Sequence, residues 1–192
     1  MGQLIGVVLA GGEGRRMGRP KGTVVLGGLT LAERAANALR PLCGSVLLSV
    51  APGMPSPTPK LATVEDAPPA FRGPLAGIEA AMAATGEADL FVLACDYAHI
   101  EAAVLRALLD AVRAGDDIVF PVDGKGRDHP LVGVWRRACD DRVRDALASR
   151  NYKVRGILAD LVAHRLRQSD LPGVDLDEAL RTVEHPGDLG AP

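Results

Sequence analysis

Residues 7–22 read VVLAGGEGRRMGRPKG, and they join an apolar segment to a basic loop that is rich in glycine. The nearly continuous leucine, isoleucine and valine of residues 4–9 predict a buried strand. Glycines let backbone N–H groups approach a polyphosphate, and the basic side chains that follow would neutralise its charge. The stretch therefore predicts a phosphate-binding loop after a strand, with a solvated basic turn as the alternative.

Neither of the common phosphate-binding patterns fits this loop. A P-loop requires GxxxxGK[ST], and no glycine of the loop places a Gly-Lys pair at that offset. The dinucleotide fingerprint GxGxxG begins at Gly12 but meets Met17 where its last glycine belongs. The loop therefore indicates a phosphate site of another kind.

The rest of the chain alternates apolar and amphipathic segments, which is typical of an α/β protein. Thr30 is a candidate helix cap, Pro41 a helix stop and Pro74 a first helical residue. We expect helices over residues 31–40, 74–84, 101–114, 137–149 and 154–163. We expect strands over residues 4–9, 46–50, 61–64, 90–94, 118–121 and 131–135, and a short one within residues 181–189.

This order of elements predicts one domain over residues 1–192, with a mainly parallel sheet and helices on both of its faces. Residues 51–60 contain four prolines and are expected to form an exposed connector. Ligands of such sheets bind beyond the carboxyl ends of the strands. We therefore expect the loops after residues 9, 50, 64 and 94 to form a single site.

The composition is that of a globular protein, since 47% of the 192 residues are hydrophobic and the formal net charge is −2. This balance argues against a broad surface for nucleic acid or for an anionic membrane. No signal peptide or membrane-spanning run is recognisable, and the cysteines Cys43, Cys95 and Cys139 form no CxxC pair. We expect a cytoplasmic protein with reduced thiols.

Several motifs resemble those of a known family. The segment LAGGEGRRMGRPK at residues 9–21 resembles the LAGGxSxRMGxxK signature of nucleotidyltransferases. GPLAGI at residues 73–78, Cys95-Asp96 and RDHPLVGVW at residues 127–135 are similar to motifs of the molybdenum cofactor guanylyltransferases. The resemblance implies a Rossmann-like three-layer nucleotidyltransferase fold. It also implies that GMP is transferred from GTP to the phosphate of molybdopterin, with Mg²⁺ as cofactor and pyrophosphate as leaving group.

The resemblance assigns roles residue by residue. It implies catalytic roles for Arg16, Lys21 and Asp96, while Arg15 could simply be solvated. Ser49 stands where the family often has asparagine, so the match is weaker there. The residues that it implies for GTP binding are Leu9, Ala10, Gly11, Gly12, Lys21, Ser49, Asp66, Gly77 and Asp96.

The remaining assignments concern the acceptor and the metal. Asp128 and His129, together with Arg127, are assigned to acceptor binding or to site architecture. Lys153 and Arg155 are candidates for the phosphate of the pterin. For the metal we expect Asp96, and as a hypothesis Glu184, because the sequence Thr182–Pro186 replaces the family's Asn-x-Asn-Thr-Pro pattern. The alternative is that Glu184 is a surface residue.

Two other functions remain open at this point. A CTP-dependent molybdopterin cytidylyltransferase or another small nucleotidyltransferase is the first, although LAGG and GPLAG favour guanine. A nucleotide-binding homologue without turnover is the second, and the altered C-terminal pattern is its only support. For the guanylyltransferase function we expect GTP and molybdopterin as small-molecule substrates. We also expect transient contact with molybdoenzyme maturation proteins, and no nucleic acid or membrane partner.

Overall fold

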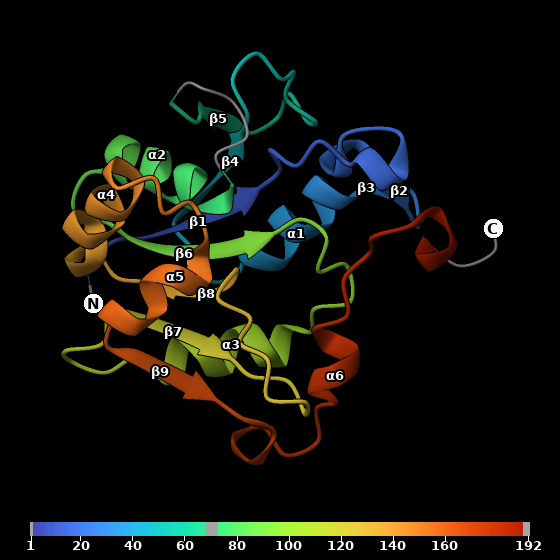
Figure 1. Cartoon of the computed structure of the whole chain (residues 1–192). Coiled ribbons are helices and arrows are strands. Elements are labelled where there is room, and N and C mark those ends of the chain that lie inside the picture. The colour runs from blue at the N-terminus through green and yellow to red at the C-terminus, as the bar shows by residue number, and fades with distance from the viewer. Residues whose placement is uncertain (1, 68–72, 190–192) are drawn as a thin grey trace.

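The computed structural model describes residues 2–67 and 73–189. A seven-stranded sheet with the order β5-β4-β1-β6-β8-β7-β9 runs through it, and β2 and β3 form a separate hairpin (Figure 1). The strands are β1 (Leu4–Leu9), β2 (Val25–Leu26), β3 (Leu29–Thr30), β4 (Ser45–Val50), β5 (Ala62–Glu65), β6 (Asp89–Ala94), β7 (Ile118–Pro121), β8 (Val132–Trp135) and β9 (Ala163–Leu166). The α-helices are α1 (Leu31–Leu39), α2 (Pro74–Thr85), α3 (Ala102–Asp110), α4 (Asp140–Ala148), α5 (Val154–Ile157) and α6 (Leu176–Ala179).

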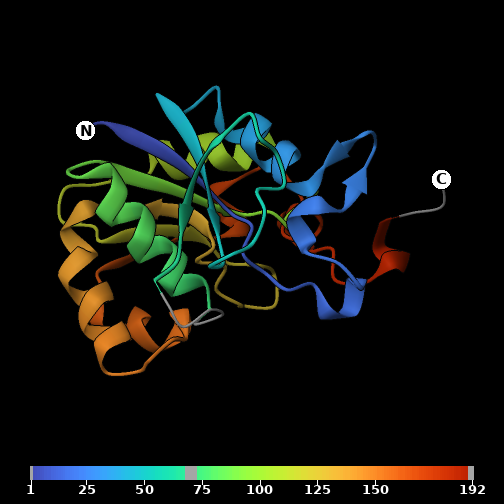
Figure 2. The same ribbon diagram turned by 90° about the horizontal axis from the view of Figure 1, so that it is seen from above.

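The sheet is mainly parallel and lies between two layers of helices. Strand β8 is antiparallel to both β6 and β7, whereas the other strand pairs of this seven-stranded sheet are parallel. Helices α1 and α3 cover one face, and α2 and α4 cover the other (Figure 2). The predicted three-layer α/β fold is therefore confirmed. None of the helices in residues 2–67 and 73–189 is long and apolar enough to cross a membrane.

The buried position of the central strands explains their apolar sequence. Val7 on β1 and Val92 and Leu93 on β6 expose no surface, because helices cover both faces of the sheet. Helix α1 begins as predicted: Thr30 Oγ1 accepts the Glu33 N–H at 3.1 Å, and Glu33 accepts the Thr30 N–H at 3.0 Å. This capping box satisfies two N–H groups that a helix start leaves without partners.

The register of the parallel strands brings the expected loops together. Leu9, the last residue of β1, pairs with Ser49 on β4 and with Ala94 on β6. Ser49 pairs in turn with Val64 on β5. The loops that follow these residues consequently leave the same edge of the sheet, as we expected.

Two predicted elements are wrong near the C-terminus. The helix expected over residues 154–163 ends at Ile157 and passes through a 3-10 turn (Leu158–Asp160) into strand β9. The buried carboxylate of Asp117 accepts the Val162 N–H at 2.8 Å, which directs the chain alongside β7. The strand expected within residues 181–189 is absent from the described chain, where a loop leads to a 3-10 turn at Pro186–Leu189.

Two further helix boundaries and the exposure of one connector differ from the prediction. Helix α3 ends at Asp110, four residues before the predicted end at 114, and a 3-10 turn over Arg137–Cys139 precedes α4. The connector 51–60 is only partly exposed, because Thr58 is buried and Pro57 packs beside Gly22. The connector thus lies against the loop that carries Lys21.

Candidate active site

The glycine loop that follows β1 presents unpaired backbone N–H groups to a cavity. The N–H groups of Gly11, Gly12 and Gly14 donate to no group within residues 2–67 and 73–189. Gly14 has a φ of 62°, and a Cβ at this position would overlap the carbonyl group of Arg19, so the turn requires glycine. Successive free N–H groups in a turn form a concave anion site.

Two cations of this loop pair with carboxylates across the cavity. Lys21 Nζ lies 2.7 Å from Oδ2 of Asp96, the second residue after β6, and both side chains are partly buried. The guanidinium group of Arg16 pairs with Glu184. Glu184 reaches this position because the Val183 N–H donates to the Asp96 carbonyl at 2.9 Å. Segments far apart in the sequence therefore bring two cations and two carboxylates together.

The other end of the cavity carries a buried polar pair. Ser49 Oγ donates to Asp66 Oδ1 at 3.2 Å, and the two residues are 2% and 8% exposed. Gly77, in the first turn of α2, packs against this pair. A Cβ at Gly77 would overlap Ser49 Oγ and lie 3.2 Å from Asp66 Oδ1. Glycine at this position therefore gives the pair its space.

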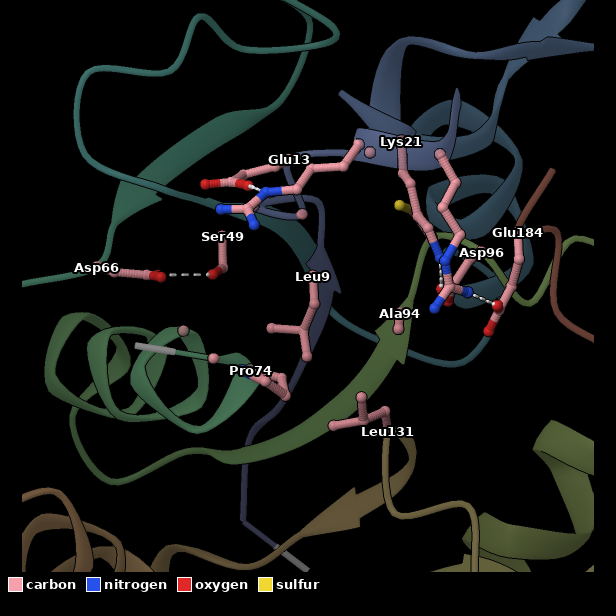
Figure 3. Close-up of a pocket in the computed structure, with 18 residues that line it drawn as sticks. Leu9, Glu13, Lys21, Ser49, Asp66, Pro74, Ala94, Asp96, Leu131 and Glu184 are labelled. Carbon is pink, nitrogen blue, oxygen red and sulfur yellow. Dashed lines mark hydrogen bonds and ion pairs between the residues drawn. The ribbon is translucent and has the colours of Figure 1, made fainter. Parts of the chain in front are cut away.

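These groups enclose one cavity of about 570 Å³, a size typical of small-ligand sites. Figure 3 shows the Ser49–Asp66 pair at one end and Lys21, Asp96 and Glu184 at the other, with Leu9 between them. The lining residues that we had predicted are Leu9, Gly11, Gly12, Arg16, Lys21, Ser49, Asp66, Gly77, Asp96 and Glu184. Lining residues that the predicted set lacked include Glu13, Arg15, Gly14, Pro74, Cys95 and Leu131.

Ala10, which we predicted to bind GTP, and Arg15, which we expected to be solvated, differ from the other loop residues. Ala10 does not line the cavity, because it is buried in the turn and its N–H donates to the Ser49 carbonyl at 2.8 Å. Arg15 lines the rim, pairs with Glu13 and keeps an 84% exposed side chain. This exposure agrees with the interpretation of Arg15 as a solvated residue.

His129 lies in a polar cluster beside the cavity. Its Nε2 is 3.2 Å from Asp123 Oδ2, and its Nδ1 is 3.1 Å from the Tyr97 hydroxyl. Because a carboxylate only accepts, a neutral imidazole donates from Nε2 to Asp123 and accepts from Tyr97 at Nδ1. Both ring nitrogens are thus engaged, which favours site architecture over acceptor contact for His129.

Charge and burial act strongly within this cluster. Burial opposes ionisation of Asp123, but the backbone N–H and side chain of Arg127 and the ring of His129 donate to it. These hydrogen bonds hold the pKa of Asp123 well below its usual range. Burial, with a smaller contribution from the Asp96 charge, raises the pKa of Tyr97. Asp123 and Tyr97 were not among the predicted site residues, although Tyr97 follows Asp96 and Asp123 precedes the Asp128-His129 pair by five residues.

The predicted acceptor residues are only partly brought together. Asp128 and Arg155 line a second cavity of about 420 Å³, together with Arg127 and Arg165. Lys153 is exposed just before α5 and lines neither cavity, and neither does His129. We did not predict a site role for Arg165, because it lies on β9, a strand that we did not expect after the helix predicted over residues 154–163.

The donor groups of the first cavity fit a magnesium-like ion. Among the described residues, no group of three or more His, Cys, Asp or Glu side chains is arranged around a metal position. Asp96 and Glu184 nevertheless line the same end of the cavity. Mg²⁺ usually takes one or two protein carboxylates and fills its other positions with water and phosphate oxygens. Asp96 and Glu184 therefore supply enough protein ligands for such an ion once Lys21 and Arg16 leave them to bind a phosphate.

Comparison with known proteins yields consistent similarities. The family model of the MobA-like NTP transferase domain matches residues 6–167 of this chain. The chain is 34% identical over 193 residues to the "probable molybdenum cofactor guanylyltransferase" of Mycobacterium tuberculosis, covering 96% of this chain and 94% of the relative.

Solved structures share the fold. A molybdopterin-guanine dinucleotide biosynthesis protein A from Archaeoglobus fulgidus superposes with a TM-score of 0.79 at 24% identity, covering 96% of this chain and 94% of the other. A Mycobacterium tuberculosis protein in complex with manganese gives a TM-score of 0.60 at 20% identity, covering 86% of this chain and 87% of the other.

Proposed function

The chain belongs to the MobA-like NTP transferase family, and on that premise we propose that it transfers GMP from GTP to the phosphate of molybdopterin. One observation carries the proposal. A single cavity holds free glycine N–H groups, Arg16 and Lys21 at one end and the buried Ser49–Asp66 pair at the other. The mycobacterial relative, which covers nearly the whole chain, supports guanine as the base and molybdopterin as the acceptor.

The reaction asks the protein for positioning and charge neutralisation. An oxygen of the acceptor phosphate attacks the α-phosphorus of GTP. The bond from that phosphorus to the bridging oxygen breaks, and its electron pair leaves with pyrophosphate. The glycine N–H groups, Arg16 and Lys21 stabilise the charge on the triphosphate and on the leaving group. The attacking phosphate is already ionised, so no general base is required.

We assign Asp96 and Glu184 as the ligands of Mg²⁺. When bound, such an ion neutralises negative charge on the reacting phosphates. Asp96 is suited to this role because it lies two residues after the end of the buried strand β6, and Glu184 is tied to it through the Val183–Asp96 backbone hydrogen bond. The manganese complex of a structural relative is consistent with a divalent ion in this fold.

The nucleoside belongs at the opposite end of the cavity in this proposal. A carboxylate such as Asp66 can accept hydrogen bonds from the N1–H and amino group of guanine, or from a ribose hydroxyl. Leu9 and Gly77 line the same cavity, and we assign Gly11 and Gly12 to the phosphates of the nucleotide. Ala10 contributes by holding the turn rather than by direct contact.

The acceptor is assigned to the loop before β8 and to the start of α5. Asp128 and Arg155 line the second cavity there, and Lys153 is exposed nearby in the chain. His129 supports this region by connecting Asp123 to Tyr97, the residue that follows Asp96. We further propose that residues 1–192 act as one cytoplasmic transferase domain that contacts molybdoenzyme maturation proteins transiently.

Pyrophosphate release tests the proposal. The purified chain would be incubated with molybdopterin, Mg²⁺ and either GTP, CTP or ATP, with Asp96→Asn as the control. We expect release with GTP and a large loss in the variant. Preference for CTP would show that the chain transfers CMP rather than GMP. GTP binding without release of pyrophosphate would identify a homologue that has lost turnover.

A further inference from the structure

The second cavity is strongly basic and contains a pre-positioned arginine. Arg165 Nε lies 3.1 Å from Asp128 Oδ1, and its Nη2 lies 3.1 Å from Asp128 Oδ2. The guanidinium carbon also lies 5.1 Å from the ring centroid of Phe120, a distance that permits a cation–π contact. Asp128 and Phe120 therefore fix the orientation of the Arg165 guanidinium.

Two further arginines offer hydrogen-bond donors to the same cavity. Arg127 donates from Nε to Asp123 at 2.6 Å, which anchors its side chain. Within residues 2–67 and 73–189, the terminal nitrogens of Arg127 and the whole guanidinium group of Arg155 have no partner. Three arginines thus line the cavity against one aspartate. Guanidinium forks bind planar anionic groups with two hydrogen bonds each.

A hydrogen bond connects this basic cavity to the nucleotide cavity. Asp96 lines the first cavity, and Asp128 lines the second. The residues that follow them, Tyr97 and His129, are joined by the hydrogen bond of 3.1 Å between the hydroxyl group and Nδ1. The two cavities are therefore joined through neighbouring residues of the chain, which is consistent with one ligand that contacts both.

We propose that the second cavity binds the acceptor through an anionic group other than its reacting phosphate, with Arg155 and Arg165 as specificity residues. This inference rests on the proposed function, in which the reaction takes place beside Lys21 and Asp96, and it replaces the expectation that Arg155 binds the phosphate of the pterin. The volume of about 420 Å³ accommodates more than a single small ion. Asp128 neutralises Arg165 until the ligand arrives.

The first test needs no turnover. Inorganic phosphate and pyrophosphate are titrated into the ¹⁵N-labelled chain while the amide signals of Gly126 and Ala159, in the second cavity, are followed. We expect saturable shifts that Arg155→Met weakens by about tenfold. Arg155 has no partner among the described residues, so this variant should keep its fold. Shifts confined to Gly11 and Gly12 would overturn the proposal.

The second test uses steady-state transfer of GMP. Arg155→Met and Arg165→Lys should each raise the KM for molybdopterin by about tenfold and leave the KM for GTP unchanged, because both remove a guanidinium fork. Arg106→Met, on the exposed side of α3, is the charge-matched control and should change neither constant.

The two tests separate the possible failures. If the wild type transfers no GMP, the proposed function fails, whereas the amide titration still decides whether the basic cavity binds anions. If pyrophosphate binds there but Arg155→Met leaves the KM for molybdopterin unchanged, the cavity serves the leaving product and the acceptor assignment is wrong.

Discussion

Lys21 Nζ and Asp96 Oδ2 form an ion pair of 2.7 Å that joins the glycine loop to the end of β6. In the proposed function Lys21 binds the negatively charged triphosphate, whereas Asp96 binds the positively charged metal ion. Each partner must therefore leave the other before it can act. A triphosphate that attracts Lys21 frees the Asp96 carboxylate, so binding of the metal and binding of the nucleotide are coupled.

Lys21→Met should separate these two effects. Without the competing ammonium group, Mn²⁺ should bind the nucleotide-free chain several-fold more tightly. This change corresponds to a gain of about 1 kcal/mol in binding free energy. The rate of transfer should nevertheless fall by about a hundredfold, because a charge on the triphosphate is no longer stabilised. Electron paramagnetic resonance measures free Mn²⁺, and Lys125→Met, an exposed lysine, is the control. Unchanged Mn²⁺ affinity in Lys21→Met would show that the ion pair does not compete with the metal.

Gly77→Ala should damage the nucleoside end of the cavity. The new methyl group would overlap Ser49 Oγ and press on Asp66 Oδ1, which costs about 1–3 kcal/mol when a packed site cannot relax. We expect a higher Kd for GTP, measured by calorimetry, with metal binding retained. Ser49→Ala in the same chain should recover part of the loss, because it removes the overlapping hydroxyl group. Additive effects in this double-mutant cycle would argue against the contact.

The positions of several cavity-lining residues could be predicted from the sequence, because one local rule decides where they lie. Residues 4–9 and 90–94 are apolar because both faces of their strands are covered, and parallel pairing then aligns their ends. Leu9, Ser49 and Asp66 consequently reach one edge of the sheet. The free N–H groups of the loop follow from its glycines. These features require no knowledge of distant contacts.

Long-range contacts decided the features that the sequence could not predict. Residues 154–163 carry apolar residues at helical spacing, yet the Asp117 carboxylate turns the chain at Val162 into β9, and with it Arg165 into the second cavity. Strand direction is likewise invisible in a short apolar run, so the antiparallel β8 was not foreseen. The place of Glu184 depends on one hydrogen bond between Val183 and Asp96.

Glu184→Gln should weaken the response to Mg²⁺. An amide oxygen lacks the charge that Mg²⁺ prefers in its protein ligands, so more Mg²⁺ should be needed for half-maximal transfer. Arg16 also loses its charged partner in this variant. Because Arg16 is then free to bind the triphosphate, GTP binding without metal should be unchanged or tighter. Glu178→Gln removes an exposed carboxylate paired with Arg181 and is the matched control. The assignment of Glu184 as a ligand is wrong if both variants keep the wild-type Mg²⁺ dependence.

Asp123→Asn should make stability less dependent on pH. Burial opposes the charge of Asp123, yet the donors of Arg127 and His129 hold its folded pKa well below the unfolded value of about 3.9. The folded state therefore binds fewer protons, and the stabilisation is complete above about pH 5 and is lost as the pH falls through the acidic range. At pH 7 the wild type should exceed the variant by about 1–3 kcal/mol in free energy of unfolding. Urea titrations should show this gap narrowing toward acidic pH, whereas a constant gap would contradict the role of the Asp123 charge.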